Sequence, residues 1–477
     1  MLIPIVNPDA VAVAESGAHH AVSGWITAVF GALLVVMIVA LALEEKIHAK
    51  KSVIVGVSAV VCLLLAAILG ILPFDELTLD RAGSEVDLPV YIPAVDWGVI
   101  CIILGSSLFV DITARGGLFS WIAVRLTKTS GGDPLKLLIL YSVMTVVFSA
   151  LLNNVTAMII IGSLTAVSLN RLGRQDQLLG FLLIEGLLTN VGGLLTLISS
   201  VPNIIIGKTA GISFVEFFVK ASPYVLVTMV VTIWLGAKLY KIHRLSSGDE
   251  RSEAAERVAG FDENDGVDSA FGFWLGAVML TAFIACIAAA SVPGWFLYDL
   301  GMGYVAMAFG VVMLIRYKST ADRVYQGLDW DLLGFFVFLF IVINVMEHAL
   351  VLDAIGQALK PVFSMGASTG PLVLMFTSAA VSSVTDNIPL AAMLARILDT
   401  VPDVGGVKGS PYWWSVIFGA NLGGNLTPIG SASTLVAVAI MHKHKLQMSF
   451  SRFVRAAIPF ALLQLALAAA YMLLFLR

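Results

Sequence analysis

Long apolar stretches separated by short polar loops follow one another along most of the chain. A helix that crosses the hydrocarbon core of a bilayer needs about 20 mostly apolar residues. The pattern therefore predicts a series of membrane-spanning helices, with ends expected within a few positions of the apolar stretches. The clearest spans are 25–43, 52–72, 97–114, 221–240, 270–292, 303–316, 331–346 and 456–476.

Four further apolar stretches are interrupted by Asn, Gly, Pro or Thr, at residues 138–169, 178–208, 370–399 and 412–441. Each is long enough for two half-helices with a polar joint between them. Because backbone polar groups must be satisfied inside a bilayer, such breaks persist only where they line a protein cavity. We interpret 138–169 and 370–399 as re-entrant hairpins and the other two stretches as discontinuous helices.

The composition points the same way, because 59% of the 477 residues are hydrophobic and only 13% are charged. Soluble domains carry about 25% charged residues, so this surface suits lipid rather than water. Cys62, Cys101 and Cys286 lie apart in apolar runs, without the spacing of a metal or redox site. We therefore expect an all-α polytopic membrane protein with no cofactor, no metal beyond a possible sodium ion, and no nucleic-acid partner.

The distribution of lysine and arginine predicts the orientation. With the N-terminus outside and both hairpins re-entrant, 21 of the 28 basic residues fall inside, six outside, and Arg396 within the second hairpin. Cytoplasmic loops are enriched in Lys and Arg, which supports this arrangement in a plasma membrane. Both termini are then outside, and the hydrophilic linker 241–268 is cytoplasmic and expected to be mobile.

Sequence landmarks recur on the two sides of the linker, which separates an N-terminal part, 1–240, from a C-terminal part, 269–477. Each part has about five membrane segments in the same order, and the orientation makes them run in opposite directions. Inverted repeats of this kind are characteristic of secondary transporters. The landmarks lie 231 to 236 positions apart and pair Asp111 with Glu347, Asn154 with Asn387, and Asn190 with Asn421.

The polar joints are the predicted substrate or ion site. Amide, hydroxyl and freed backbone groups can bind an ion, and glycines permit the tight backbone of a break. The alternative is that these groups only hold helices together, but a doubled Asn–Gly–Thr pattern favours a transport site. The candidates are Asn153, Asn154, Thr156, Asn190, Gly192, Gly193, Thr196, Asn203, Asp386, Asn387, Asn421, Gly423, Gly424, Asn425 and Thr427.

Charged residues within apolar stretches are candidates for coupling, because a carboxylate is costly in a membrane and usually functional. Asp386 stands at the tip of the second hairpin, where the first hairpin has the neutral Asn153. Asp111 has an alternative role as a local ion pair with Arg115, one helical turn later. The remaining coupling candidates are Glu185, Glu347 and His348.

Several motifs resemble the ion transporter superfamily, in its citrate transporter-like branch. That branch includes arsenite permeases, sodium/proton antiporters of the NhaD type and the melanosomal P protein. The motifs are EEKIHAKK, LLNNVTAMII, NVGGLLTLISSVPNIIIG, VTDNIPLAAML and GANLGGNLTPIGSAST. Relatives with a carboxylate in the first hairpin have Asp-Asn there, whereas this chain has Asn153-Asn154, so one acidic ligand is missing.

The resemblance implies a scaffold domain and a moving transport domain, usually in a homodimer that works by an elevator-like movement. The hairpins and broken helices would form the transport domain. The remaining spans would form the scaffold, with an amphipathic arm near residues 120–128 along the interface.

Three functions remain open. The first is secondary exchange of protons, and plausibly sodium, with Asp386 as the titrating group. The second is transport of an anion or oxyanion such as arsenite, silicate or a carboxylate, which half-helix N-termini and Arg396 would favour. The third is a passive channel. An intramembrane enzyme is disfavoured, because the sequence has no HExxH, no GxSxG and no Cys/His cluster.

Overall fold

The computed structural model describes residues 22–72, 77–79, 85–264, 266–267, 269–401, 404–407 and 409–476. Both chain ends, for which an outside location was predicted, lie beyond these residues. The described part is helical apart from one antiparallel pair of short strands, β1 (Leu77–Leu79) and β2 (Glu85–Asp87). Nine of its helices are long and apolar enough to cross a membrane.

Each of the eight predicted spans corresponds to one long helix. The helices are α2 (Gly24–Ala42), α4 (Lys51–Ile68), α5 (Trp97–Arg115), α11 (Phe214–Leu239), α13 (Ala270–Ala289), α14 (Phe296–Arg316), α16 (Trp330–His348) and α22 (Phe450–Phe475). The ninth long apolar helix, α7 (Pro134–Leu151), is the first arm of the first hairpin.

Three of these helices begin earlier than the apolar pattern suggests. In α11 the charged residues Glu216 and Lys220 do not end the helix, because they form an ion pair one turn apart at 2.8 Å. In α22 the hydroxyl of Ser449 caps the first turn ahead of the apolar run. In α14 the predicted start follows a real kink at Gly301, whose φ is 76°.

All four interrupted stretches consist of two helices with a joint. The hairpins are α7 with α8 (Asn154–Arg171), and α18 (Gly366–Ser382) with α19 (Asn387–Asp399). The discontinuous helices are α9 (Leu178–Gly192) with α10 (Val201–Thr209), and α20 (Pro411–Gly423) with α21 (Ala432–Lys443). The order hairpin, broken helix, closing helix thus occurs twice, with α11 and α22 as the closing helices.

An arm helix precedes each hairpin: α6 (Leu118–Ser130), which contains the predicted arm, and α17 (Val351–Phe363). Both follow a residue in the left-handed region, Gly117 at φ 80° and Leu350 at φ 58°. Only glycine fits at position 117, because a Cβ there would lie 2.2 Å from the carbonyl oxygen of Gly266.

The linker contains a helix, α12 (Gly248–Ala259), although we predicted a mobile segment. Ser247 caps it, Val258 is buried, and Arg257 donates to the carbonyl of Leu172 at 3.1 Å. Beyond the helix, Glu263 forms ion pairs with the arm α6. The prediction rested on polarity alone, which does not reveal these anchors. Shorter helices are α3 (Glu44–Ile47), η1 (Gln175–Gln177), η2 (Lys318–Thr320) and α15 (Ala321–Gly327).

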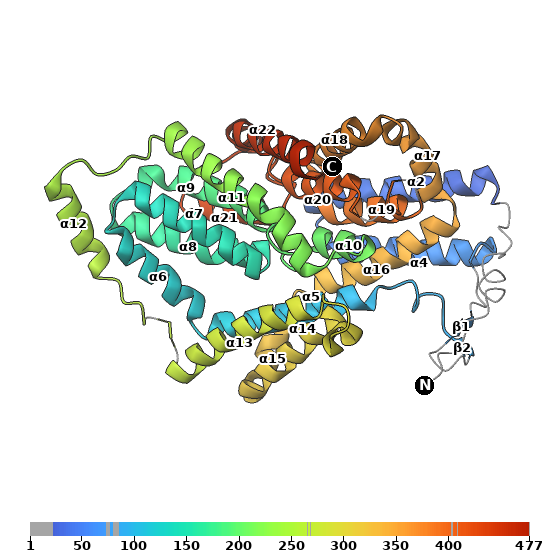
Figure 1. The fold of residues 1–477 in the computed structure, drawn as a ribbon, viewed down its shortest axis with the longest axis horizontal. Coiled ribbons are helices and arrows are strands. Elements are labelled where there is room, and N and C mark those ends of the chain that lie inside the picture. The colour runs from blue at the N-terminus through green and yellow to red at the C-terminus, as the bar shows by residue number, and fades with distance from the viewer. Residues whose placement is uncertain are drawn as a thin grey trace.

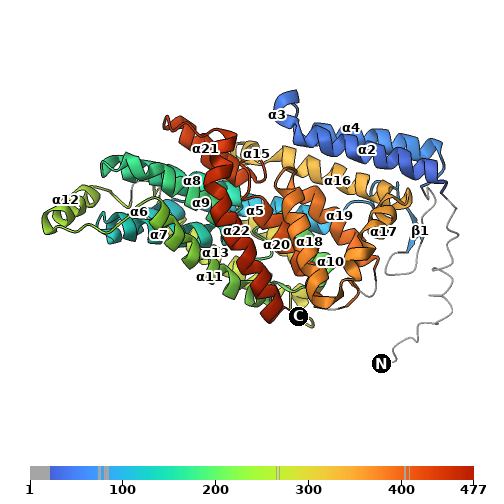
Figure 2. The ribbon, with the colours of Figure 1, turned by 90° about the horizontal axis from the view of Figure 1, so that it is seen from above.

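By their contacts the helices form two groups. Figure 1 shows the first hairpin (α7, α8) on the left and the second (α18, α19) on the right. In one group, α4 packs on α16 and α2, and α5 packs on α14; Figure 2 shows α2 and α4 side by side along one edge of the molecule. In the other, the hairpins and broken helices pack together. The closing helices α11 and α22 pack with this second group, on α7, α9 and α20. The prediction that they join the scaffold therefore does not match their contacts.

Candidate functional site

Hairpin and broken helix meet through corresponding bonds in the two halves. The hydroxyl of Ser149 donates to the carbonyl of Thr189 at 2.6 Å, and that of Ser382 donates to the carbonyl of Ala420 at 2.6 Å. The serines are 233 positions apart in the sequence and their acceptors 231. The contacts of the first half are therefore repeated in the second.

The predicted threonines make the next pair of matching bonds. Thr196 donates its hydroxyl to the carbonyl of Ala150 at 2.6 Å, and Thr427 donates to the carbonyl of Ser383. Both bonds connect the loop of a broken helix to the end of a hairpin arm. Because both hydroxyls donate to backbone carbonyls, they position the joints and do not face open space.

The predicted glycines at the joints allow two helix backbones to touch. A Cβ at Gly192 would lie 2.8 Å from the Cα of Val146, and one at Gly423 would lie 2.4 Å from the carbonyl oxygen of Ala379. Small residues permit this close approach of helices in membranes. Gly193 and Gly424 are similarly enclosed by Asn154 and by the backbone of Gly430.

The two broken helices exchange reciprocal hydrogen bonds. Ser200, in the first joint, donates to the side-chain oxygen of Asn421 at 2.8 Å. Ser431, in the second joint, donates to the side-chain oxygen of Asn190 at 2.9 Å. The joints of both halves therefore meet at one buried centre, and Asn190 and Asn421 stand at equivalent positions within it.

A chain of amides extends from the first hairpin through this centre. Asn154 donates to Asn190 at 3.3 Å, Asn190 donates to Asn425 at 2.8 Å, and Asn425 donates to Gln464 at 2.8 Å. Gln464 in turn donates to the hydroxyl of Thr232 at 3.2 Å. The sequence prediction missed Gln464 and Thr232; the available signal was a polar residue within an apolar closing span.

A second branch involves Asn421 and Asn203. Asn421 donates to the side-chain oxygen of Asn203 at 2.9 Å, and Asn203 donates to the carbonyls of Gly193 at 2.7 Å and Thr196 at 3.1 Å. Both amides are buried. We call the two branches the amide network, made of Asn154, Asn190, Asn425, Gln464, Thr232, Asn203, Asn421, Ser200 and Ser431. It is uncharged and internally satisfied.

Helix N-termini also point to this region. Neither Ser200 nor Ser431 caps its following helix through the side chain, so the first N–H groups of α10 and α21 lack a side-chain partner there. Such N-termini carry partial positive charge and attract anions. The centre therefore combines amide oxygens, which suit a cation, with helix ends, which suit an anion.

The two hairpin tips differ in charge and in contacts. Asn153 accepts from the N–H of Thr156 at 2.8 Å and so caps α8. Asp386 accepts from the N–H of Ile388 at 2.9 Å and caps α19, while its other oxygen accepts from the ammonium group of Lys51 at 2.5 Å. The prediction placed Asp386 among the joints but did not foresee Lys51 as its partner.

The residue after each cap differs as well. Asn154 lies in the amide network, where its oxygen also accepts from Ser149 at 2.6 Å. Asn387 is half-buried, and its side chain has no hydrogen-bond partner in the described part of the chain. Of the predicted symmetric pair, Asn154 therefore makes side-chain hydrogen bonds and Asn387 makes none within the described residues.

Three coupling candidates lie away from the network. Asp111 pairs with Arg115 at 2.9 Å, and both side chains are about one third exposed or more. The contacts of Asp111 therefore match the local ion pair that the sequence offered as its alternative role. Glu347 lies 4.0 Å from Arg396, and His348 bonds to a carbonyl of its own helix at 2.9 Å. Only the contact of Glu347 with Arg396 joins two helices, α16 and α19, and none of the three contacts reaches the joints.

The structure also gives a different register for the repeat in this region. Asp96 and Asp329, 233 positions apart, cap α5 and α16 in the same way. The indole of Trp97 donates to the carbonyl five residues earlier, as does that of Trp330. This register places Glu347 one helical turn beyond the counterpart of Asp111, so these two carboxylates are not equivalent.

Glu185 differs from the other candidates because it is fully buried. Thr165 donates to one carboxyl oxygen at 2.6 Å, while the other oxygen has no partner. Glu185 lies on α9, the helix that carries Asn190, but it is not part of the amide network. It remains a separate buried acid within the group of hairpins and broken helices.

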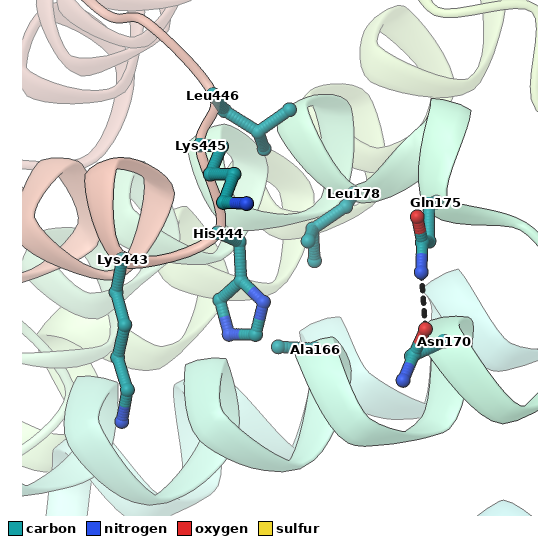
Figure 3. A pocket seen from close by; sticks show the side chains of 8 residues that line it. All are labelled: Ala166, Asn170, Gln175, Leu178, Lys443, His444, Lys445 and Leu446. Carbon is teal, nitrogen blue, oxygen red and sulfur yellow. Dashed lines mark hydrogen bonds between the residues drawn. The ribbon is translucent and has the colours of Figure 1, made fainter.

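A cavity of about 250 Å³ opens near the ends of α8, α9 and α21. Figure 3 shows His444 pointing toward Ala166, with Lys443 and Lys445 on either side in the chain. This basic basin shares no residue with the amide network. Within the described ranges, no three His, Cys, Asp or Glu side chains are grouped to hold a metal ion.

Taken together, these spans and buried polar joints define a multi-pass membrane transporter. Residues 25–419 match the family described as citrate transporter (CitMHS), and the chain belongs to this family. It is 28% identical to an uncharacterised transporter of Mycobacterium tuberculosis, over 79% of this chain and 86% of the relative. It is 23% identical to the human P protein, over 90% of this chain and 60% of that protein.

A solved structure shares the fold. The chain is similar to the YdaH transporter of Alcanivorax borkumensis with a TM-score of 0.60 and 13% identity. The match covers 88% of this chain and 97% of that one. At this identity the likeness concerns the fold alone.

Proposed function

We propose that the protein is a secondary active cation transporter that exchanges protons, with or without sodium, by an elevator-like movement. The observation that carries this proposal is Asp386, a carboxylate at a hairpin tip whose side chain is only 11% exposed and whose charge is balanced by one lysine. A buried carboxylate in a membrane protein that can exchange partners is suited to binding a cation or a proton.

The amide network supplies the neutral part of the proposed site. Amide and carbonyl oxygens are hard ligands of the kind that alkali and alkaline-earth cations prefer. Asn154 and Asn190 belong to the network, and Asn387, next to Asp386, has an unoccupied amide. A cation held between Asp386 and the network would use one charged ligand and several neutral ones.

The moving unit in this proposal is the group of hairpins and broken helices together with α11 and α22. The helices α2, α4, α5, α13, α14 and α16 form the scaffold. We further propose a homodimer in the plasma membrane, with the central linker in the cytoplasm. The mass of the protein in lipid nanodiscs would test the dimer, since a monomeric mass contradicts it.

The direct test is ion exchange in proteoliposomes. Replacing Asp386 by Asn removes the carboxylate proposed to bind the proton but keeps a side chain able to cap α19. Transport should then lose its dependence on pH. Asp353→Asn is the matched control, because Asp353 is an exposed acid on α17 and should leave transport unchanged. Unaltered pH-dependent exchange in the Asp386 variant would sink the assignment.

A second candidate is transport of an anion such as a carboxylate, arsenite or silicate. It is favoured by the uncapped N-termini of α10 and α21 and by the family description of a citrate transporter. Uptake of labelled citrate and of arsenite, measured beside sodium and proton flux in the same vesicles, separates the two. Flux that ignores every co-ion gradient would instead indicate a channel.

A further inference from the structure

Ion pairs connect the second hairpin and α10 to the scaffold. Among the described residues, each such pair joins a residue of the moving group to α4, to α16 or to the residue that caps α5, and no such pair involves the first hairpin. The pairs are Asp386 with Lys51 at 2.5 Å, Arg396 with Glu347 at 4.0 Å, and Lys208 with Asp96.

Of these, the pair of Lys51 and Asp386 is the least exposed. The side chain of Asp386 is 11% exposed and that of Lys51 is 31% exposed, whereas Arg396 and Glu347 are each more than one third exposed. Exposed pairs contribute little because water screens them. The pair of Lys51 and Asp386 is therefore the strongest charged link between the moving group and the scaffold.

The position of Lys51 is fixed by its helix. Lys51 is the first residue of α4, and the next residue, Ser52, donates both its hydroxyl and its N–H to Asp331 of α16, at 2.5 and 3.2 Å. α4 also packs on α16, with Gly56 against the ring of Phe338. The ammonium group thus belongs to the scaffold and does not travel with the hairpin.

The charges around this ammonium group are mostly negative. The ammonium group of Lys51 is 3.7 Å from the carboxylate of Glu44 in addition to its contact with Asp386. A third carboxylate, that of Asp331, accepts a hydrogen bond from the next residue, Ser52. Arg396, on the helix α19 that Asp386 caps, lies 4.0 Å from Glu347. One lysine therefore faces three carboxylates, and a second cation near Asp386 would find favourable charge there.

The first hairpin offers nothing comparable. Its tip carries the neutral Asn153, which is exposed and caps its own helix. Asn154 holds this hairpin to Asn190 within the moving group. Within the part of the chain that the structure describes, a charged contact with the scaffold therefore occurs only at the tip of the second hairpin.

We propose that Lys51 is a scaffold-fixed counter-ion that competes with the transported cation for Asp386. When no cation is bound, the ion pair holds the moving group in the position seen here. When a cation or proton occupies Asp386, the oxygen that accepts from Lys51 is neutralised and the hairpin tip is released. This proposal rests on the proposed function, since it requires that Asp386 binds the transported ion.

The predicted orientation adds a direction. In that orientation Lys51 is among the basic residues expected inside, and the second hairpin is expected to enter from the outside. The pair would then join an outer hairpin to the inner end of α4. The position seen here then corresponds to a moving group displaced toward the cytoplasm, and Lys51 stabilises that end state.

The test measures the distance between scaffold and hairpin directly. Spin labels are placed at Val53 and Val384, which are exposed residues close in sequence to Lys51 and Asp386, after Cys62, Cys101 and Cys286 have been replaced by Ala. Pulsed electron paramagnetic resonance of the full chain in nanodiscs then gives the distance distribution with and without sodium, at high and low pH.

We expect one dominant short distance without sodium at high pH, and a second, longer distance with sodium or at low pH. Lys51→Gln should raise the longer-distance population about fivefold without any ligand, a ratio typical of one partly exposed charge pair. Lys51→Arg should retain the short distance. Lys50→Gln is the matched control, because it removes the same charge from the adjacent exposed residue and should change nothing.

Two outcomes separate this proposal from the proposed function. If Lys51→Gln leaves the distances unchanged while Asp386→Asn still abolishes pH-dependent exchange, the counter-ion role is wrong and the transport assignment stands. The double variant Lys51→Asp with Asp386→Lys exchanges the two charges. If it restores the short distance but transports no cation, the counter-ion role and the transport assignment are both supported. A wild-type distribution that ignores sodium and pH overturns the competition.

Discussion

The two hairpin tips show how a repeated architecture acquires unequal chemistry. The first tip has two neutral residues, and Asn154 is bound to the amide network through Ser149 and Asn190. The second has a carboxylate that reaches Lys51 of the scaffold, and its neighbour Asn387 is unbound in the described residues. The first tip is held by neutral hydrogen bonds within the group of hairpins and broken helices, and the second by an ion pair with α4.

The difference matters because the two kinds of contact respond to different things. Neutral amide bonds do not depend on pH or on ions, so the first hairpin should stay docked throughout a transport cycle. An ion pair can be broken by protonation or by a competing cation. The second hairpin is therefore the one whose contact with α4 can respond to pH and to cations.

The largest expected effect is a loss of stability that should be equal in the two halves, because the hairpin packs on the broken helix in the same way in each. Gly192→Ala and Gly423→Ala each place a Cβ within 3 Å of a packed backbone, so each should lower the free energy of unfolding by about 3 kcal/mol. The measurement is unfolding in mixed detergent micelles. Gly31→Ala is the control, because nothing lies within 4 Å of a Cβ there.

A clear difference in unfolding free energy between the two glycine variants would contradict equivalent packing of the two hairpins. It would mean that one hairpin can shift away from its broken helix while the other cannot. Equal losses would support equivalent packing at the two joints.

The next effect separates the asparagines. Asn154→Ala leaves the hydroxyl of Ser149 and the oxygen of Asn190 with one bond fewer, so we expect a loss of about 2 kcal/mol in the free energy of unfolding. Asn387→Ala removes no hydrogen bond and should change that free energy by less than about 0.5 kcal/mol. If Asn387 binds the transported ion, its variant should nevertheless weaken the apparent affinity for sodium.

Each variant is the control for the other in this prediction. Equal destabilisation by both substitutions would show that Asn387 reaches the amide network as Asn154 does. A stable Asn387 variant with normal ion affinity would remove that residue from the proposed site.

The smallest effect concerns the arm of the first half. Lys128 and Arg125 of α6 form ion pairs with Glu263 of the linker, and the hydrogen bond from Lys128 lowers the pKa of Glu263 below its ordinary value. A carboxyl group whose pKa is lower in the folded state stabilises the fold above its ordinary pKa, and this contribution is lost as pH falls through the lowered value. The link should therefore weaken only in acid.

Hydrogen exchange of the linker at decreasing pH measures this change. Protection should fall in the wild type below the ordinary pKa of glutamate, and Glu263→Gln should show the lower protection already at neutral pH. Glu256→Gln, in the linker helix, is the control. Equal behaviour of the Glu263 and Glu256 variants would contradict a specific link between linker and arm.

The sequence alone determined much of this protein. The eight spans and the four interrupted stretches follow from apolar length and from breaks at Asn, Gly and Pro, because a bilayer permits few alternatives. The equivalence of Asn190 and Asn421 also followed, since matching motifs in matching positions imply matching contacts. These predictions depend on local composition and on repetition, both of which are visible in one dimension.

Only the tertiary structure decided which polar groups meet. Lys51 and Asp386 are 335 positions apart, and nothing in the sequence next to either residue indicates the other. Gln464 and Thr232 belong to the amide network, although the sequence did not indicate them. Asp111 and His348 have partners within their own helices. Contacts between distant segments depend on how helices are packed, and no local pattern encodes the partner of a single charge.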